Sequence, residues 1–130
     1  MAVIAVQDQS LSNWLKMEAY ADLAYARNTY NFTGVAGTKY PHGTVVADDN
    51  GNVIPWTGAQ DPVGMLYHTE TGTGAAQKVL VLFRGPAAVR LKGLVFPNTV
   101  TAPQIENLRK ELEFKGFEVL DSVIAKPYAN

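Results

Sequence analysis

The chain of 130 residues contains no cysteine, which excludes a disulfide framework, a thiolate zinc site and a cysteine nucleophile. Charged residues make up only 18% of the sequence, below the roughly 25% of a typical soluble domain. The formal net charge is −1, so no strong field attracts nucleic acid or an anionic membrane. Few charges in a chain of ordinary apolar content suggest that a partner covers part of the surface.

Long hydrophobic runs are also missing. The first six residues, MAVIAV, are apolar, but they lack the basic flank and cleavage site of a signal peptide. No window reaches the roughly 18 apolar residues of a transmembrane helix. A chain of this length buries about two-thirds of its unfolded surface, so we expect one compact domain that folds without a metal.

The residues that usually carry catalysis are few and scattered. The two histidines, His42 and His68, do not form an H-x-x-x-H pair, and the sequence predicts ordinary polar residues near loops at both positions. None of the three serines, Ser10, Ser12 and Ser122, lies in a G-x-S-x-G motif. We therefore predict no catalytic residue.

Two glycine-containing stretches resemble ligand-binding loops incompletely. The G-x-G of Thr71–Ala76 is followed by Gln77, where a dinucleotide fingerprint needs a third glycine, and by a strand instead of a helix. Asp48–Asn52 resembles the start of a calcium loop, but its glycine comes one position early. Both are better explained as turns, so we predict no cofactor and no metal.

From Gly34 onward, Gly and Pro residues separate short apolar runs, which indicates a β-rich domain. Asn50-Gly51 predicts a type I′ hairpin between two strands, and Pro55 must lie at a strand end or edge. The stretch at 78–84 is nearly all apolar, which predicts a strand buried on both faces. The predicted strands span 43–48, 53–56, 63–68, 78–84, 87–91, 92–97 and 117–125.

One helix is predicted, from about Ala102 to Lys115. Thr101 and Gln104 have the spacing of a capping box, and Gly116 follows as a stop signal. The fold class is therefore mainly β with one short α-helix (α+β).

Residues 1–33 are rich in Ala, Tyr and Asn and allow two interpretations. Leu11, Trp14 and Leu15 have helical spacing, but the following YADLAYARNTYNF could equally be extended. The sequence alone does not choose between a helix and a strand here.

The ordered set YPHGTVV, NGNVIPWTG, PVGMLYH, VLVLFRGPAAV, GLVFP, a short helix and KGFEVLDSVI resembles the head decoration proteins of tailed bacteriophages, the lambda-like trimeric family. The resemblance covers about residues 38–125. It implies a small β-barrel or β-tulip-like decoration domain at 34–130 and an extended N-terminal capsid-binding arm at 1–33. It also implies a structural protein without enzymatic activity.

The resemblance further implies a homotrimer at the three-fold and quasi-three-fold positions of the expanded phage head. The protein would be made in the host cytoplasm and would bind the major capsid protein on the outer surface of the virion. It would stabilise the head against internal DNA pressure. Strand addition to the capsid needs an extended apolar segment, so the expected capsid-binding residues are Val3, Ile4, Val6, Leu11, Trp14 and Leu15.

Two other functions are compatible with the composition. One is a different virion structural β-domain, in the tail or in head completion. The other is a small β-barrel hydrolase or ligand-binding domain that uses His42 or His68.

Overall fold

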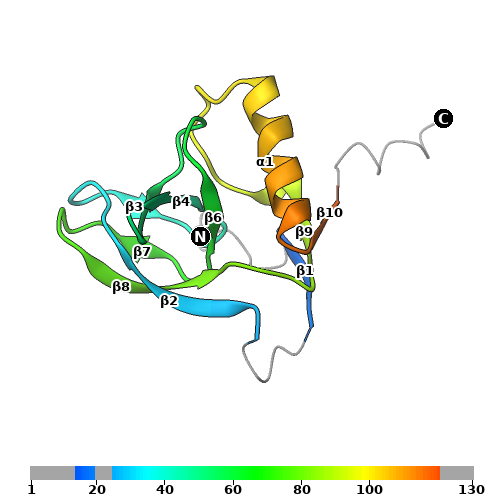
Figure 1. Ribbon diagram of the computed structural model, residues 1–130. Helices are drawn as coiled ribbons and strands as arrows, with labels where there is room; N and C mark the ends of the chain where they lie inside the picture. Colours follow the sequence, from blue (N-terminus) through cyan, green and yellow to red (C-terminus); the bar gives the residue numbers. More distant parts are fainter. Residues whose placement is uncertain (1–13, 20–24, 121–130) are drawn as a thin grey trace, which may run out of the picture.

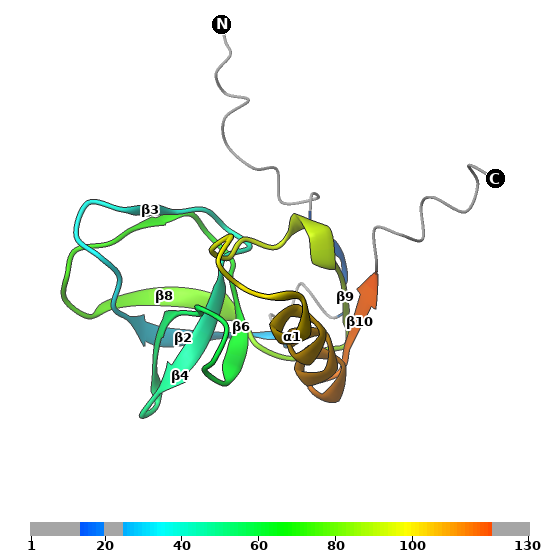
Figure 2. The same cartoon turned by 90° about the horizontal axis from the view of Figure 1, so that it is seen from above.

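The computed structural model describes residues 14–19 and 25–120. Its elements divide into a barrel and a smaller sheet with a helix beside it (Figures 1 and 2). In chain order they are β1 (Leu15–Glu18), β2 (Arg27–Phe32), β3 (Lys39–Tyr40), β4 (Val45–Asp49), β5 (Asn52–Pro55), β6 (Pro62–Leu66), β7 (Glu70–Thr71), β8 (Gln77–Leu82), β9 (Ala87–Arg90), the 3-10 turn η4 (Leu91–Gly93), α1 (Ala102–Phe114) and β10 (Phe117–Leu120).

The barrel is closed by five strands in the order β2-β5-β4-β6-β8. Strand β2 completes it, pairing antiparallel with β8 from Arg27 to Phe32 and parallel with β5 through Phe32 and Val53. The short strands β3 and β7 pair with each other beside the barrel. The predicted fold class is confirmed: the protein is mainly β with one helix.

The hairpin between β4 and β5 follows the Asn-Gly signal in the sequence. Asn50 and Gly51 have φ angles of 55° and 92°, the left-handed conformations that a type I′ turn requires. The Asp48 side chain accepts a hydrogen bond from the backbone N–H of Gly51 (3.1 Å). Pro55 is the last residue of β5, as its missing N–H predicts.

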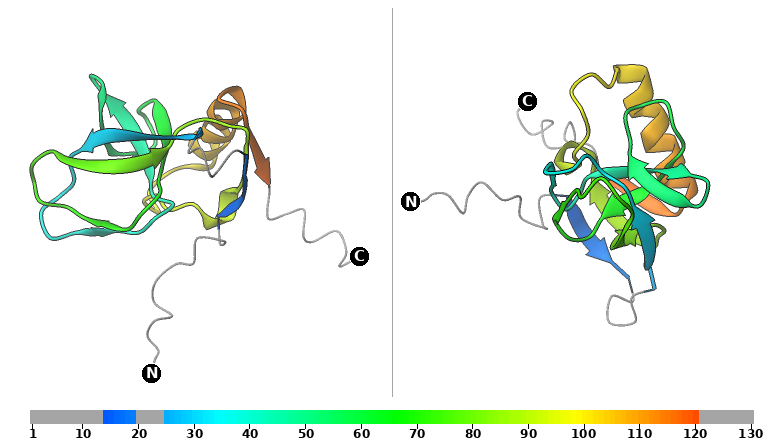
Figure 3. Two further views of the ribbon diagram at one scale, coloured as in Figure 1. Left: turned by 90° about the horizontal axis from the view of Figure 1, so that it is seen from below. Right: turned by 90° about the vertical axis from the view of Figure 1, so that its left-hand side faces the viewer.

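The second sheet contains three strands in the order β1-β9-β10. Strand β1 runs antiparallel to β9, whereas β10 runs parallel to it. Figure 3 shows this small sheet from two further sides, at the opposite end of the molecule from the β3–β7 pair. Residues 15–18, for which the sequence allowed either state, are therefore extended.

Helix α1 has the capping box that the sequence predicts. The Thr101 hydroxyl accepts a hydrogen bond from the backbone N–H of Gln104, and the Gln104 side chain accepts one from the backbone N–H of Thr101. Leu108 and Leu112 are buried, and Ile105 packs against the same core. Gly116, with φ 97°, ends the helix and leads directly into β10.

The core consists of two clusters. The barrel interior contains Phe32, Val46, Val53, Leu66, Val79 and Val81. The larger cluster joins the barrel, α1 and the three-stranded sheet, and its largest fully buried members are Trp14, Trp56, Met65, Leu82, Leu108 and Leu112. This second cluster holds the sheet and the helix against the barrel.

Two predicted strands differ from the structure. Residues 92–97 do not form a strand. Residues 92–93 belong to η4, and Val95 makes a single parallel bridge to Thr44. Strand β8 is not buried along both faces, because Lys78 is exposed and Leu80 is only half-buried. One of its faces fills the barrel, while the other lies partly in solvent.

The predicted division of the chain at residue 33 stays a prediction. Strand β2, which lies before that position, belongs to the barrel because it pairs with β8 along its whole length. The segment on either side of residue 33 is thus continuous with the β-rich domain.

Gly64 is expected to be essential for closing the barrel. A Cβ atom at this position would overlap the carbonyl oxygen of Leu82 on the neighbouring strand β8. We expect Gly64→Ala to lower the free energy of unfolding by about 3 kcal/mol because the β6–β8 pairing must shift. Urea denaturation monitored by tryptophan fluorescence measures this change.

The matched control is Gly74→Ala. Gly74 has φ 81°, but the nearest atom to an added Cβ is 3.5 Å away, so only the left-handed backbone costs about 1 kcal/mol. If both variants lost the same free energy of unfolding, the proposal that Gly64 allows β6 and β8 to lie close together would be contradicted.

Candidate functional site

The base of the N-terminal segment is fixed at Trp14, whose side chain is fully buried. Its indole N–H donates a hydrogen bond to Nδ1 of His42 (3.0 Å). Its carbonyl oxygen accepts a hydrogen bond from the backbone N–H of Arg90 (2.6 Å). The next residue, Leu15, pairs with Val89 in the sheet. Because both the ring and the backbone of Trp14 are hydrogen-bonded, the position at which the N-terminal segment joins the domain is fixed.

A second contact ties β1 to the barrel. The Glu18 carboxylate accepts hydrogen bonds from Nε of Arg27 (2.7 Å) and from the Tyr67 hydroxyl (3.2 Å). The Arg27 guanidinium carbon also lies 4.5 Å from the centre of the Tyr67 ring. The Glu18 side chain is only 4% exposed, so removal of its hydrogen-bond partners would leave a buried charge without compensation, which is costly.

These contacts change the acid–base properties of the residues involved. The hydrogen bond to Glu18 raises the pKa of Arg27. Burial, reinforced by the nearby Glu18 charge, raises the pKa of Tyr67. At neutral pH the cluster therefore holds a charged arginine and a neutral phenol, which are the forms that the carboxylate needs as hydrogen-bond donors.

The structure describes two of the six predicted capsid-binding residues. Trp14 and Leu15 lie together at the start of β1, with Trp14 buried and Leu15 partly buried against the larger core cluster. A direct contact of these two with a capsid stays a prediction. The other four, Val3, Ile4, Val6 and Leu11, lie outside the described residues.

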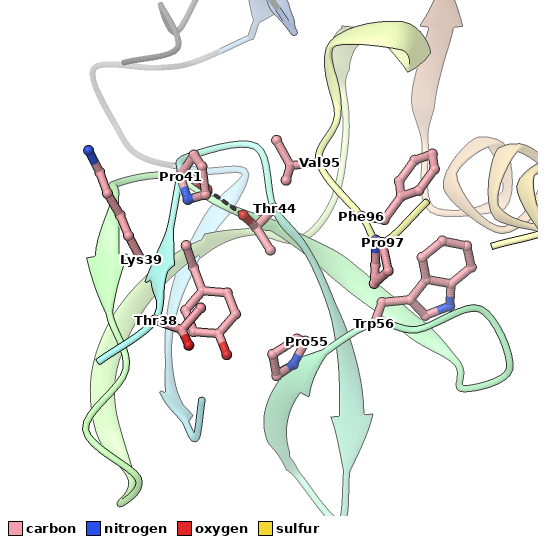
Figure 4. Close-up of a pocket in the computed structure, with 10 residues that line it drawn as sticks. Thr38, Lys39, Pro41, Thr44, Pro55, Trp56, Val95, Phe96 and Pro97 are labelled. Atoms are coloured by element: carbon pink, nitrogen blue, oxygen red, sulfur yellow. Dashed lines mark hydrogen bonds between the residues drawn. The ribbon is translucent and has the colours of Figure 1, made fainter. Parts of the chain in front are cut away.

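An apolar hollow opens between the barrel and the segment after η4 (Figure 4). Its volume is about 230 Å³. Pro41, Pro55 and Pro97 come from three separate parts of the chain, and the Phe96 ring meets the Trp56 ring edge-to-face at 5.6 Å. Figure 4 shows Lys39 at the rim with its amine directed away from the hollow. Such a lining suits contact with another apolar surface.

Exposed apolar side chains are further candidates for contact with a partner. The most exposed is Phe114 at the end of α1, at 90%, and Val35 follows at 67%. Tyr25 is also exposed, and the Arg84 guanidinium carbon lies 4.0 Å from its ring centre. Aromatic residues paired with arginine are typical of protein–protein interfaces.

The two histidines occupy unrelated environments. His42 accepts the Trp14 hydrogen bond, whereas His68 is exposed beside Tyr67. Within residues 14–19 and 25–120, no three His, Cys, Asp or Glu side chains come together in a way that could hold a metal ion. In the same part of the chain, no helix is long and apolar enough to span a membrane.

An anchored N-terminal segment, an apolar hollow and exposed aromatic side chains on a small barrel define a structural module that acts through protein contacts. The family model described as bacteriophage lambda head decoration protein D matches residues 5–117, which are 113 of the 130 residues (117 − 5 + 1). A search of curated proteins gave no match. The chain belongs to the bacteriophage lambda head decoration protein D family.

Family membership decides several of the expectations from the sequence. The protein is a structural component of the phage head surface and is not an enzyme. The hydrolase interpretation of His42 and His68 is therefore wrong. The predicted association with the capsid is confirmed at the level of the family.

Loss of the His42 ring is expected to weaken the anchor of β1. In His42→Ala the buried Trp14 indole N–H loses its acceptor, which costs about 1–3 kcal/mol. The matched variant His68→Ala removes an exposed ring, and its effect should stay within about 0.5 kcal/mol. Thermal denaturation of both variants compares them, and equal stabilities would contradict an anchoring role for His42.

The raised pKa of Tyr67 predicts a loss of stability at high pH. The folded state favours the neutral phenol, whereas an unfolded tyrosine ionises near pH 10. The contribution of Tyr67 to the free energy of unfolding is therefore fully present below about pH 10, and it is lost as the pH rises through the folded-state pKa.

The variant Tyr67→Phe removes this titration. We expect its free energy of unfolding to fall less steeply than that of the wild type between about pH 9 and 11. Urea denaturation across this range measures both slopes. Parallel slopes would show that Tyr67 does not titrate differently in the two states.

Proposed function

We propose that this protein binds the outside of the expanded phage head as a homotrimer at three-fold and quasi-three-fold positions. There it stabilises the shell against the pressure of the packaged DNA by joining neighbouring major capsid subunits. The match to the head decoration family over residues 5–117 is the observation that carries this proposal.

The N-terminal segment is the proposed main attachment. Val3, Ile4 and Val6 lie in the continuous apolar stretch MAVIAV, and strand addition to the edge of another sheet needs an extended apolar segment of this kind. Trp14 and Leu15 support it by fixing its base to β9 through the Arg90 and Val89 pairings. Three such segments on one trimer can each bind weakly, because linked engagement raises the overall affinity by ~10²–10⁴.

The low charge content agrees with a trimer. With 18% charged residues and exposed Phe114, Val35 and Tyr25, the chain has apolar surface that contact with other copies or with the capsid would cover. Analytical ultracentrifugation should therefore show a trimer or a monomer–trimer equilibrium.

Deleting residues 1–13 should abolish binding to expanded heads without unfolding the domain. The deletion must stop before Trp14, because Trp14 belongs to the core. The measurement is co-sedimentation with heads assembled without decoration protein, together with the melting temperature. Full binding by the truncated protein would contradict attachment through the N-terminal segment.

A pair of matched triple variants tests which residues of the segment act. Val3→Asp/Ile4→Asp/Val6→Asp places three charges on the apolar positions, and Gln7→Glu/Gln9→Glu/Asn13→Asp adds the same charge at polar positions. Only the first should lose head binding, because burying unpaired carboxylates is costly. Equal losses would indicate a charge effect instead of an apolar strand contact.

A further inference from the structure

Helix α1 ends on an aromatic side chain that the fold leaves uncovered. Phe114, the last residue of the helix, is 90% exposed, more than any other large hydrophobic side chain among the described residues. It follows the buried Leu112 by two positions, which is about 200° around a helix, so packing of Leu112 in the core turns Phe114 toward solvent. A phenyl ring at the end of a helix is a protrusion suited to a recess of matching size.

The hollow between the barrel and the segment after η4 is a recess of this kind (Figure 4). Its volume of about 230 Å³ exceeds the roughly 150 Å³ of an apolar cavity that binds benzene. Polar groups of its lining are already engaged within the protein. The Thr44 hydroxyl donates to the carbonyl oxygen of Pro41, and the Trp56 indole N–H donates to that of Gln60. The hollow therefore suits a hydrocarbon ring better than a polar side chain.

The ring of one copy cannot fill its own hollow. Trp56 lines the hollow, and two residues later a Cβ atom on Gly58 would lie 2.6 Å from the side chain of Gln104, in the first turn of α1. Phe114 is ten residues further along the helix, about 15 Å away along its axis (Figure 1). The protrusion and the recess thus lie near opposite ends of α1, on different parts of the surface.

A cyclic trimer requires this separation of two complementary patches. In a ring of three copies each contact joins two different patches, because rotation about the three-fold axis brings one side of a copy against another side of its neighbour. We propose that Phe114 of each copy inserts into the apolar hollow of the next copy around the trimer. This inference rests on the proposed function, which supplies the trimer, and it assigns the two patches that meet.

The charges around the two patches are complementary. Lys39 is the charged residue of the hollow's lining, and Figure 4 shows it at the rim. The exposed charged residues in the last turn of α1 are Lys110, Glu111 and Glu113. They carry one positive and two negative charges, and Lys115, just after the helix, is half-buried. Insertion of Phe114 brings this net negative side to the rim, whereas two hollows facing each other would oppose two lysines.

Truncation of the ring tests the contact. Phe114→Ala should raise the protein concentration at which half of the chains are trimeric by about tenfold or more, because each contact loses its central apolar group. Phe114→Leu retains a large apolar side chain and should shift that concentration by less than about threefold. Sedimentation velocity measures both shifts. Since Phe114 is 90% exposed, the monomers of both variants should melt at the wild-type temperature.

The absence of cysteine allows the two patches to be joined selectively. Lys110 lies one helical turn before Phe114 on the same face, Thr38 lines the hollow, and both are exposed. In Lys110→Cys/Thr38→Cys, a short bis-maleimide should join copies into covalent dimers and trimers, with no larger species because the ring closes. In the control Lys110→Cys/Lys78→Cys, the second thiol is exposed on β8 away from the hollow, and the chains should stay largely monomeric on a denaturing gel.

The outcomes separate the inference from the proposed function. A wild-type protein that stays monomeric in solution and on expanded heads overturns the proposed trimer and the inference with it. A trimer that Phe114→Ala forms as readily as the wild type, or equal cross-linking of the two cysteine pairs, overturns the inference and leaves the proposed function intact. The inference also fails if Phe114→Ala trimerises normally but loses head binding, since the ring would then contact the shell.

Discussion

Strand β9 is the element on which the rest of the small sheet depends. Four residues long, it is hydrogen-bonded along both edges, to β1 on one side and to β10 on the other. Its first three side chains, Ala87, Ala88 and Val89, are buried, and Val89 shares a core cluster with Trp14 and Leu112. This short strand therefore brings together three parts of the chain: the first described residues, the segment that follows the barrel, and the helix. Because each edge of β9 holds a different end of the chain, disrupting it would release both together.

The features that local chemistry determines could be predicted from the sequence. The Thr101–Gln104 capping box acts within four residues, and Asn50-Gly51 specifies its turn through backbone conformations that few other residues adopt. Residues 92–97 show what local sequence does not determine. Their apolar side chains predict a strand, yet only Val95 forms a bridge to another part of the chain. Trp14 and Leu15 had helical spacing, but pairing with β9 outweighed it. Whether an extended segment finds a partner depends on residues far away in the chain.

The contact surfaces were harder to predict for the same reason. The apolar start of the chain is visible in the sequence, but its anchor joins Trp14 to a histidine 28 positions later. The support of β1 joins Glu18 to a tyrosine 49 positions later. The hollow draws its prolines from three separate parts of the chain, and no spacing in the sequence connects them. The sequence predicts a helix that includes Phe114, but the exposure of this side chain follows from how α1 packs, with Leu108 and Leu112 buried.

A rigid base also explains how a weak segment can be an effective attachment. Each residue that becomes ordered on binding costs about 1–2 kcal/mol of backbone entropy, so residues fixed beforehand reduce the total cost. Here Trp14 is already held by His42 and Arg90, and Glu18 by Arg27 and Tyr67. In the proposed attachment, these anchored residues would therefore add no ordering cost of their own. In the proposed trimer, an apolar segment of a few residues on each copy would then secure the protein to the shell without any reactive group.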